Sequence, residues 1–149
     1  MKPVHKLLLF TIIALAAYLR LYRLSDIPPG VNRDEASIGY TAYSLLQTGK
    51  DEYGRTFPLS FESFGDWKLP LYIYTTIPFV GLLGMTELAV RLPSALSGIF
   101  TIGALFVLVR ILFGNVPLAL LSSLILTLSP WHIHISRVES ESNIAILLS

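Results

Sequence analysis

Long apolar stretches set the limits on how this chain can fold. Runs with few or no charges occur at residues 7–24, 69–86, 92–109 and 111–132. Each approaches the roughly 20 residues that a helix needs to cross the hydrocarbon core of a bilayer. Hydrophobic residues make up 53% of the chain and charged residues only 14%. This balance favours a membrane protein over a soluble domain.

The first apolar stretch is interpreted as an uncleaved membrane anchor. Lys2, His5 and Lys6 precede it, and it continues into Arg20 and Arg23 instead of ending at a small-residue cleavage site. A signal peptide would need such a site after a short apolar core. We therefore expect a span whose N-terminus is cytoplasmic.

The polar segment 25–68 is predicted to be a long ordered loop that contains one short amphipathic helix. Asn32 is a candidate N-cap, Glu35 follows it at capping-box spacing, and Gly49 can end the helix. The helix is expected over residues 33–48, at the membrane surface.

The stretch 69–86 decides the topology. If it spans the bilayer, Arg110 faces outward and the polar run 137–141 is cytoplasmic. Pro70 and Pro78 interrupt the stretch, which also suits a juxtamembrane or re-entrant helix. In that case Arg110 becomes cytoplasmic, as the positive-inside tendency prefers, and 137–141 lies on the same side as the first loop.

The sequence therefore predicts an all-α, polytopic helical membrane protein with a large first external loop. The chain is expected to be the N-terminal part of a longer protein, since a new apolar stretch has only begun when it stops. The expected segments are a span at 7–24, an external loop at 25–91 with juxtamembrane helices near 33–48 and 69–86, spans at 92–109 and 116–131, and a further span starting at 144.

Two adjacent acids, Asp34 and Glu35, lie in the first turn of the predicted surface helix. Acids in this position stabilise a helix by themselves, and the spacing from Asn32 lets Glu35 complete a capping box. Capping explains Asp34 less well. A carboxylate near a membrane surface can also deprotonate a hydroxyl, so structural and catalytic interpretations both stay open.

Other charged residues lie at the predicted membrane boundary. Asp66 and Lys68 precede the proline-interrupted stretch, while Arg137, Glu139 and Glu141 follow the third span. Such residues are often simple interfacial anchors. The alternative is that the two cations bind a phosphate and the three acids contact a metal ion or a sugar.

Several other groups carry weaker signals. His132 and His134 could share a metal only on an extended backbone, so interfacial polar residues are favoured there. Asp51 lies in a predicted solvated turn, and Glu87 could pair with Arg91 one helical turn later. No phosphate-binding glycine loop, nucleophile elbow or zinc-helix motif occurs. The net charge of +1 does not indicate a nucleic-acid partner, and the chain contains no cysteine.

Four motifs together resemble the N-terminal part of the GT-C glycosyltransferases. The closest likeness is to bacterial relatives of protein O-mannosyltransferases and of the lipid A aminoarabinose transferase. Some of these relatives have Glu directly before the lysine, where this chain has Trp67. The motifs are Leu19-Arg20-Leu21 through Pro28, Asp34-Glu35-Ala36, Lys68-Leu69-Pro70-Leu71-Tyr72, and Gly84 with Glu87 to Ser94.

The resemblance implies roles for particular residues. It places an acid near the reaction centre, carried over to Asp34 and less firmly to Glu35. It also implies that Lys68 and the pair Ser136-Arg137 contact the carrier phosphate. A divalent metal is a candidate cofactor, with Asp66 as an approximate substitute for the missing glutamate.

The implied activity is that of a cell-envelope glycosyltransferase, hexosyl or pentosyl, at the non-cytoplasmic face of a membrane. It would move a sugar from a polyprenyl phosphate to a hydroxyl of an acceptor lipid, glycan or protein. The rivals are a non-enzymatic transporter or assembly subunit and an oligosaccharide transferase of the same superfamily. Because the predicted spans contain no Asp or Glu, chemistry at the membrane surface is favoured over transport.

Overall fold

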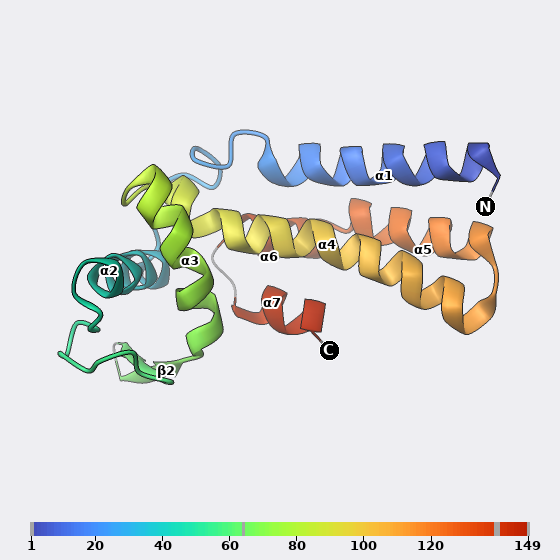
Figure 1. Cartoon of the computed structure of the whole chain (residues 1–149). Helices are drawn as coiled ribbons and strands as arrows, with labels where there is room; N and C mark the ends of the chain where they lie inside the picture. The colour runs from blue at the N-terminus through green and yellow to red at the C-terminus, as the bar shows by residue number, and fades with distance from the viewer. Residues whose placement is uncertain (1, 64, 139–140, 149) are drawn as a thin grey trace.

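The computed structural model describes residues 2–63, 65–138 and 141–148 (Figure 1). Within them the chain is mostly helical, with one small antiparallel strand pair, so the all-α prediction is confirmed. The elements are α1 (Pro3–Leu21), α2 (Arg33–Thr48), β1 (Phe61–Ser63), β2 (Asp66–Lys68), α3 (Pro70–Leu83), α4 (Glu87–Phe113), α5 (Val116–Leu128), α6 (Pro130–Arg137) and α7 (Glu141–Leu148).

Helices α1, α4 and α5 lie side by side and form an elongated bundle (Figure 1). Their shared core includes Ile12, Ala16, Ile102 and Ala119. The two alanines are fully buried, which lets the helix backbones approach closely, as in membrane helix packing. Elements α2, α3 and the strand pair gather at the other end from the N-terminus, and we call that end the loop end.

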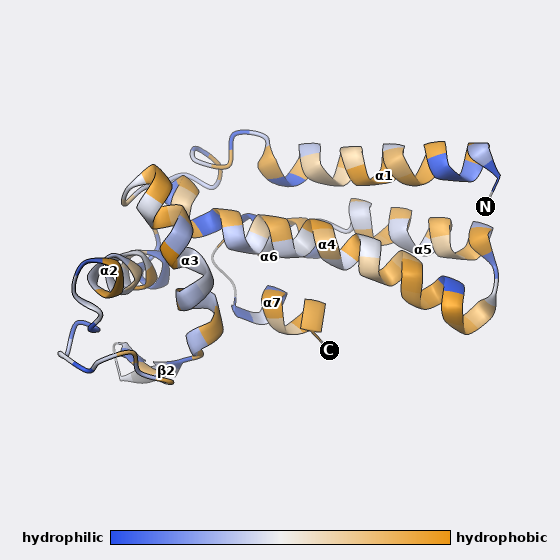
Figure 2. Ribbon diagram, in the orientation of Figure 1, coloured by the Kyte–Doolittle hydropathy of each residue, from blue (hydrophilic) through white to orange (hydrophobic). Residues whose placement is uncertain are grey.

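Two helices, α1 and α4, are each long and apolar enough to cross a membrane. Figure 2 shows hydrophobic residues along most of their length, and side chains such as Phe100 and Ile111 are exposed on α4. Exposed apolar side chains on long helices suit a lipid environment. Helix α3 is shorter and contains Pro78.

The predicted third span is broken in the structure. Helix α5 ends at Leu128, and α6 continues at an angle of 60° to it, so the two count as one span only if the bend is included. Pro130 has no N–H with which to continue α5, and the Ser129 side chain instead accepts a hydrogen bond from the His132 backbone. The sequence prediction ran through this proline and missed the bend.

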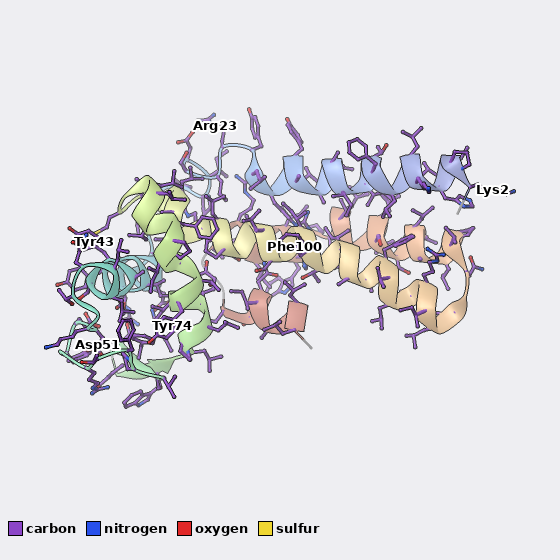
Figure 3. All side chains as sticks on the ribbon, in the orientation of Figure 1. Lys2, Arg23, Tyr43, Asp51, Tyr74 and Phe100 are labelled. Carbon is purple, nitrogen blue, oxygen red and sulfur yellow. The ribbon has the colours of Figure 1, made fainter. Side chains whose placement is uncertain are left out.

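The distribution of charge along the bundle bears on the topology. Arg110 lies in the last turn of α4, at the bundle end that also holds the start of α1 and, in Figure 3, Lys2. Arg23, labelled in the same figure, lies at the loop end. Both ends of the bundle therefore carry cations, and the expected cytoplasmic N-terminus stays a prediction.

Polar side chains join α1, α4, α6 and α7 inside the bundle. The Arg20 guanidinium contacts His132 Nδ1 at 2.8 Å, and Asn143 donates to the Ser94 backbone carbonyl at 2.6 Å. Helix α6 also packs against α4 where Gly98 faces Ser136, and a Cβ at residue 98 would come within 2.8 Å of the Ser136 Cβ. This contact requires a residue without a side chain.

Candidate functional site

The N-terminus of α2 separates the two adjacent acids. The Asn32 side chain accepts a hydrogen bond from the Glu35 amide, and the Glu35 carboxylate accepts one from the Asn32 amide, so the predicted capping box forms. Glu35 is only 2% exposed, whereas the Asp34 side chain is 55% exposed. Neighbouring residues with the same charge therefore meet opposite environments.

The buried partner of Glu35 is Arg91, from α4. Its guanidinium donates to the two carboxylate oxygens of Glu35 at 2.7 and 3.0 Å. It also donates to the backbone carbonyls of Leu24, Pro28 and Gly30, at 3.1, 3.0 and 2.6 Å. We call this arrangement the Arg91 clamp, and it ties the end of the first loop segment and the start of α2 to α4.

Sequence reasoning missed the Arg91 clamp because it paired this arginine with Glu87. The two clamp partners are 56 positions apart, a separation that helical spacing cannot indicate. The available signal was a lone arginine inside the apolar start of α4, since a buried charge requires a partner. The clamp engages both oxygens of Glu35, which favours the structural interpretation of this acid.

Asp34 and Lys68 are brought together by the strand pair. Phe61 pairs with Lys68 in the register of β1 and β2, and Gly65 at the turn has a φ of 82°, a conformation that favours glycine. The ammonium of Lys68 lies 3.1 Å from Asp34 Oδ1 and 3.3 Å from the Asp34 carbonyl. Its side chain is only 12% exposed, so it approaches Asp34 from a largely covered position.

Glu141 joins the same region from α7. Both of its carboxylate oxygens lie 3.2 Å from the amide nitrogen of Leu69, the residue before α3. Residues near positions 34, 68 and 141 therefore meet at the loop end. The side chain of Asp66 and the whole of Glu139 lie outside the described part of the structure, so their predicted metal or sugar contacts stay predictions.

No group of three potential metal-ligating side chains occurs among the described residues. His132 and His134 lie in helix α6, where residues two apart point to different faces. His132 is buried against Arg20, while His134 is exposed. Helix α6 packs the His132 ring inside the bundle, and the expectation that the two histidines lie at the membrane interface stays a prediction.

Arg137 contacts backbone rather than an open surface. Its guanidinium donates to the carbonyls of Leu19 and Tyr22 at 2.8 Å each and of Ile27 at 2.9 Å, and it lies 3.5 Å from that of Arg23. These carbonyls belong to the end of α1 and the turn after it, where the backbone lacks the full set of helical hydrogen bonds. The Arg23 carbonyl also accepts hydrogen bonds from the amides of Asp26 and Ile27. The predicted phosphate contact of Arg137 is untested, and the guanidinium is engaged in holding this turn.

The geometry supports specific chemistry. Asp34 offers an exposed carboxylate that can accept a proton, and Lys68 offers a positive charge beside it. Glu35, Arg91 and Arg137 fix the backbone around these two groups. The loop end thus brings an acid and a cation together.

Comparison with known proteins supports a transferase. The sequence profile of the dolichyl-phosphate-mannose-protein mannosyltransferase family matches residues 68–149, more than half of the chain. Lys68, Arg91 and Arg137 lie within the match, while Asp34 precedes it. The match agrees with the GT-C type indicated by the motifs but does not distinguish the particular relatives. No curated protein and no solved structure matches the chain significantly.

Proposed function

Because the chain belongs to the dolichyl-phosphate-mannose-protein mannosyltransferase family, a family of membrane glycosyltransferases, we propose that it transfers a sugar from a polyprenyl-phosphate carrier to an acceptor hydroxyl at the non-cytoplasmic face. The observation that carries this proposal is the contact between exposed Asp34 and Lys68 at the loop end. A donor with a long isoprenoid tail stays in the bilayer. Groups that act on its headgroup must therefore lie at the membrane boundary.

In the proposed reaction Asp34 is the general base. The acceptor hydroxyl oxygen bonds to the anomeric carbon of the sugar as its proton passes to the Asp34 carboxylate. The bond between the anomeric carbon and the phosphate oxygen breaks, and the polyprenyl phosphate leaves with the bonding electrons. Lys68 stabilises the charge on this leaving group.

Because Asp34 and Lys68 are paired before the substrates bind, the donor is expected to bind Lys68 before Asp34 accepts a proton. The Asp34 carboxylate is more than half exposed, so water can solvate it when an incoming phosphate takes the ammonium of Lys68. The carboxylate is then free to accept the proton of the acceptor. Donor binding thus prepares the base.

Glu35, Arg91 and Arg137 act as positioning residues in this proposal. Glu35 and Arg91 hold the first turn of α2, which carries Asp34, and Arg137 holds the turn that follows α1. None of the three needs to contact the substrate. Their contribution is to keep Asp34 and Lys68 in a fixed geometry, on which catalysis depends.

The test compares Asp34→Asn with Asp26→Asn in the full-length protein in membranes, with polyprenyl-phosphate sugars as donors. Asp26 is a suitable control because it is an exposed acid of the same loop that pairs with Arg23 at 3.0 Å. Hydrogen bonds from Arg23 and Ser25 also lower the pKa of Asp26, which makes it a poor base.

Asp34→Asn is expected to slow transfer about 10²–10⁴-fold, the usual contribution of a general base. Asp26→Asn should leave transfer nearly unchanged. Undiminished transfer by Asp34→Asn would exclude Asp34 as the base.

A further inference from the structure

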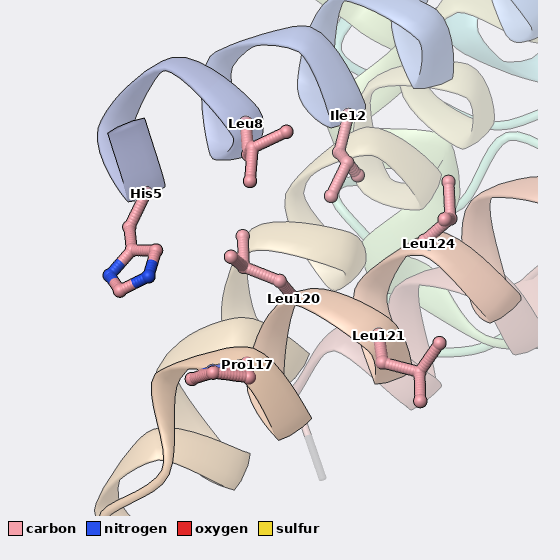
Figure 4. A pocket seen from close by; sticks show the side chains of 7 residues that line it. All are labelled: His5, Leu8, Ile12, Pro117, Leu120, Leu121 and Leu124. Carbon is pink, nitrogen blue, oxygen red and sulfur yellow. The ribbon is translucent and has the colours of Figure 1, made fainter. Parts of the chain in front are cut away.

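We propose that the apolar groove between α1 and α5 binds a phospholipid with an anionic headgroup, an inference that does not depend on sugar transfer. The groove has a cavity volume of about 330 Å³. It is lined from α1 by His5, Leu8 and Ile12, and from α5 by residues that include Leu120 and Leu124 (Figure 4). Leu8 is exposed, so a lipid chain can enter the groove from the side of the bundle.

The groove has one polar end and an apolar length. His5, Leu8 and Ile12 are three and four residues apart, which puts them on one face of α1. Figure 4 shows His5 at the end of the groove where α1 begins. The wall from His5 to Ile12 covers about 10 Å of helix, and the other lining residues are apolar. This shape accommodates part of an acyl chain, with the headgroup beside the start of α1.

The charge at the polar end favours an anion. Lys2 and Lys6 flank His5 in the first turn of α1, and both lysines are exposed. Residues 2–25 and 88–138 contain no Asp or Glu, so no carboxylate from these segments offsets the two cations. Lysines close to a lipid surface attract anionic headgroups, and each adds its own favourable contribution. Cations at one end and a hydrocarbon wall behind them match an anionic phospholipid.

A second apolar groove shows what this charge adds. It lies between α3, α4 and α7 and consists of two adjoining pockets of about 290 and 260 Å³, both lined by Leu71 and Ile144. The charged residue that lines it is an acid, Glu141. Apolar surface alone would favour a lipid chain in both grooves to a similar extent. The cations therefore distinguish the α1/α5 groove as the one suited to an anionic lipid.

The position of the α1/α5 groove favours a bulk phospholipid over the proposed sugar donor. Lys2 and the strand β2, which carries Lys68, lie at opposite ends of the molecule (Figures 1 and 3). Helix α1 alone has 19 residues, which extend over about 28 Å. A donor headgroup held beside Lys2 could not reach Asp34 or Lys68. The occupant is therefore a phospholipid of the leaflet that meets the N-terminal end of the bundle.

Photo-crosslinking of the full-length protein in phosphatidylcholine nanodiscs tests the proposal. The probes are phosphatidylglycerol and phosphatidylcholine, each with a diazirine on one acyl chain, and mass spectrometry maps the labelled peptides. We expect phosphatidylglycerol to label the α1/α5 groove about tenfold more than phosphatidylcholine does, because two lysines favour the anionic headgroup. Equal labelling by both probes would overturn the proposal by showing contact with bilayer lipid only. Absence of labelling would overturn it by showing that protein covers the groove.

Two kinds of variant separate the headgroup from the tail. Replacement of both Lys2 and Lys6 by Gln should lower phosphatidylglycerol labelling to the level of phosphatidylcholine, while Lys50→Gln, in the first loop, should not. Leu8→Trp fills the groove and keeps every cation, so it tests the site without changing the charges that influence membrane orientation. Its matched control is Leu71→Trp in the second groove, since Leu8 and Leu71 are 47% and 44% exposed. Undiminished labelling of Leu8→Trp would reject the groove.

Unlabelled competitors identify the anionic group. Excess phosphatidylglycerol should suppress labelling of the α1/α5 groove about tenfold, and excess phosphatidylcholine should not. Equal competition by polyprenyl phosphate would contradict a phospholipid site by showing that the groove also accepts the carrier. Equal competition by inorganic phosphate would show that the acyl chain contributes nothing, which would likewise overturn the proposal.

Discussion

Asp34 and Glu35 are adjacent in sequence, and each forms an ion pair, but the two pairs behave as different kinds of structure. Arg91 and Glu35 are both almost completely buried and share a 2.7 Å contact. Lys68 meets an Asp34 side chain that is more than half exposed. Breaking a buried pair leaves an uncompensated charge, while breaking an exposed one lets water replace the partner. The first pair therefore serves the fold, and the second is available for exchange with a substrate.

Removal of the buried cation, Arg91, is the strongest test of the difference between the two ion pairs. Arg91→Met should lower the free energy of unfolding of the full-length protein by about 3–5 kcal/mol, because Glu35 keeps a buried charge and three carbonyls lose their donor. Thermal unfolding in detergent measures the effect. Adding Glu35→Gln to Arg91→Met should recover part of the lost unfolding free energy. Glu87→Gln alone should change the unfolding free energy only slightly. An Arg91→Met protein as stable as the wild type would show that the clamp is dispensable.

Removal of Lys68, the cation that pairs with the exposed Asp34, should give the opposite pattern. Lys68→Met is expected to reduce sugar transfer about 10²–10³-fold, the usual effect of losing one charge-stabilising group. Its unfolding free energy should change less than that of Arg91→Met, because water can solvate the exposed Asp34 carboxylate that is left. Rates of transfer in membranes and thermal unfolding are measured on the same samples, with Lys50→Met as the control. A large loss of stability with normal transfer would reverse the roles of the two pairs.

Arg137 gives the smallest and most discriminating effect. If its guanidinium holds the turn after α1, both Arg137→Lys and Arg137→Met should cost about 1–3 kcal/mol of stability, because neither replaces its several directed N–H groups. The KM for the donor should hardly change. If Arg137 instead binds the donor phosphate, Arg137→Lys should keep most of the affinity that Arg137→Met loses. Donor titrations and unfolding curves of the two variants separate these outcomes.

Local signals predicted much of the helical structure. The capping box at Asn32 and the stop at Gly49 depend on residues a few positions apart, and these are the interactions that sequence spacing describes well. The same reasoning missed the strand pair at β1 and β2, which it treated as part of the long ordered loop over residues 25–68. It also missed the bend at Ser129 and Pro130, although a proline inside a helical stretch indicates such a break.

The site was predictable in part. The sequence marked both Asp34 and Lys68, and the structure places them in contact, but their proximity depends on a strand register that spacing does not reveal. Contacts of Arg91 and Arg137 with backbone carbonyls were not predictable. Every residue except the last has such a carbonyl, so the acceptors leave no trace in the amino-acid pattern, and only the folded chain shows which ones a guanidinium reaches.

The contact of Gly98 with Ser136 gives one glycine an influence far beyond its size. Helix α6 can approach α4 this closely because residue 98 has no side chain. Arg137 is the next residue after Ser136, so the depth at which α6 sits also sets the reach of the guanidinium toward the carbonyls after α1. A side chain at residue 98 would push α6 away from α4 and so move Arg137 relative to the turn after α1. A residue without a side chain thus helps to fix where the turn after α1 is held.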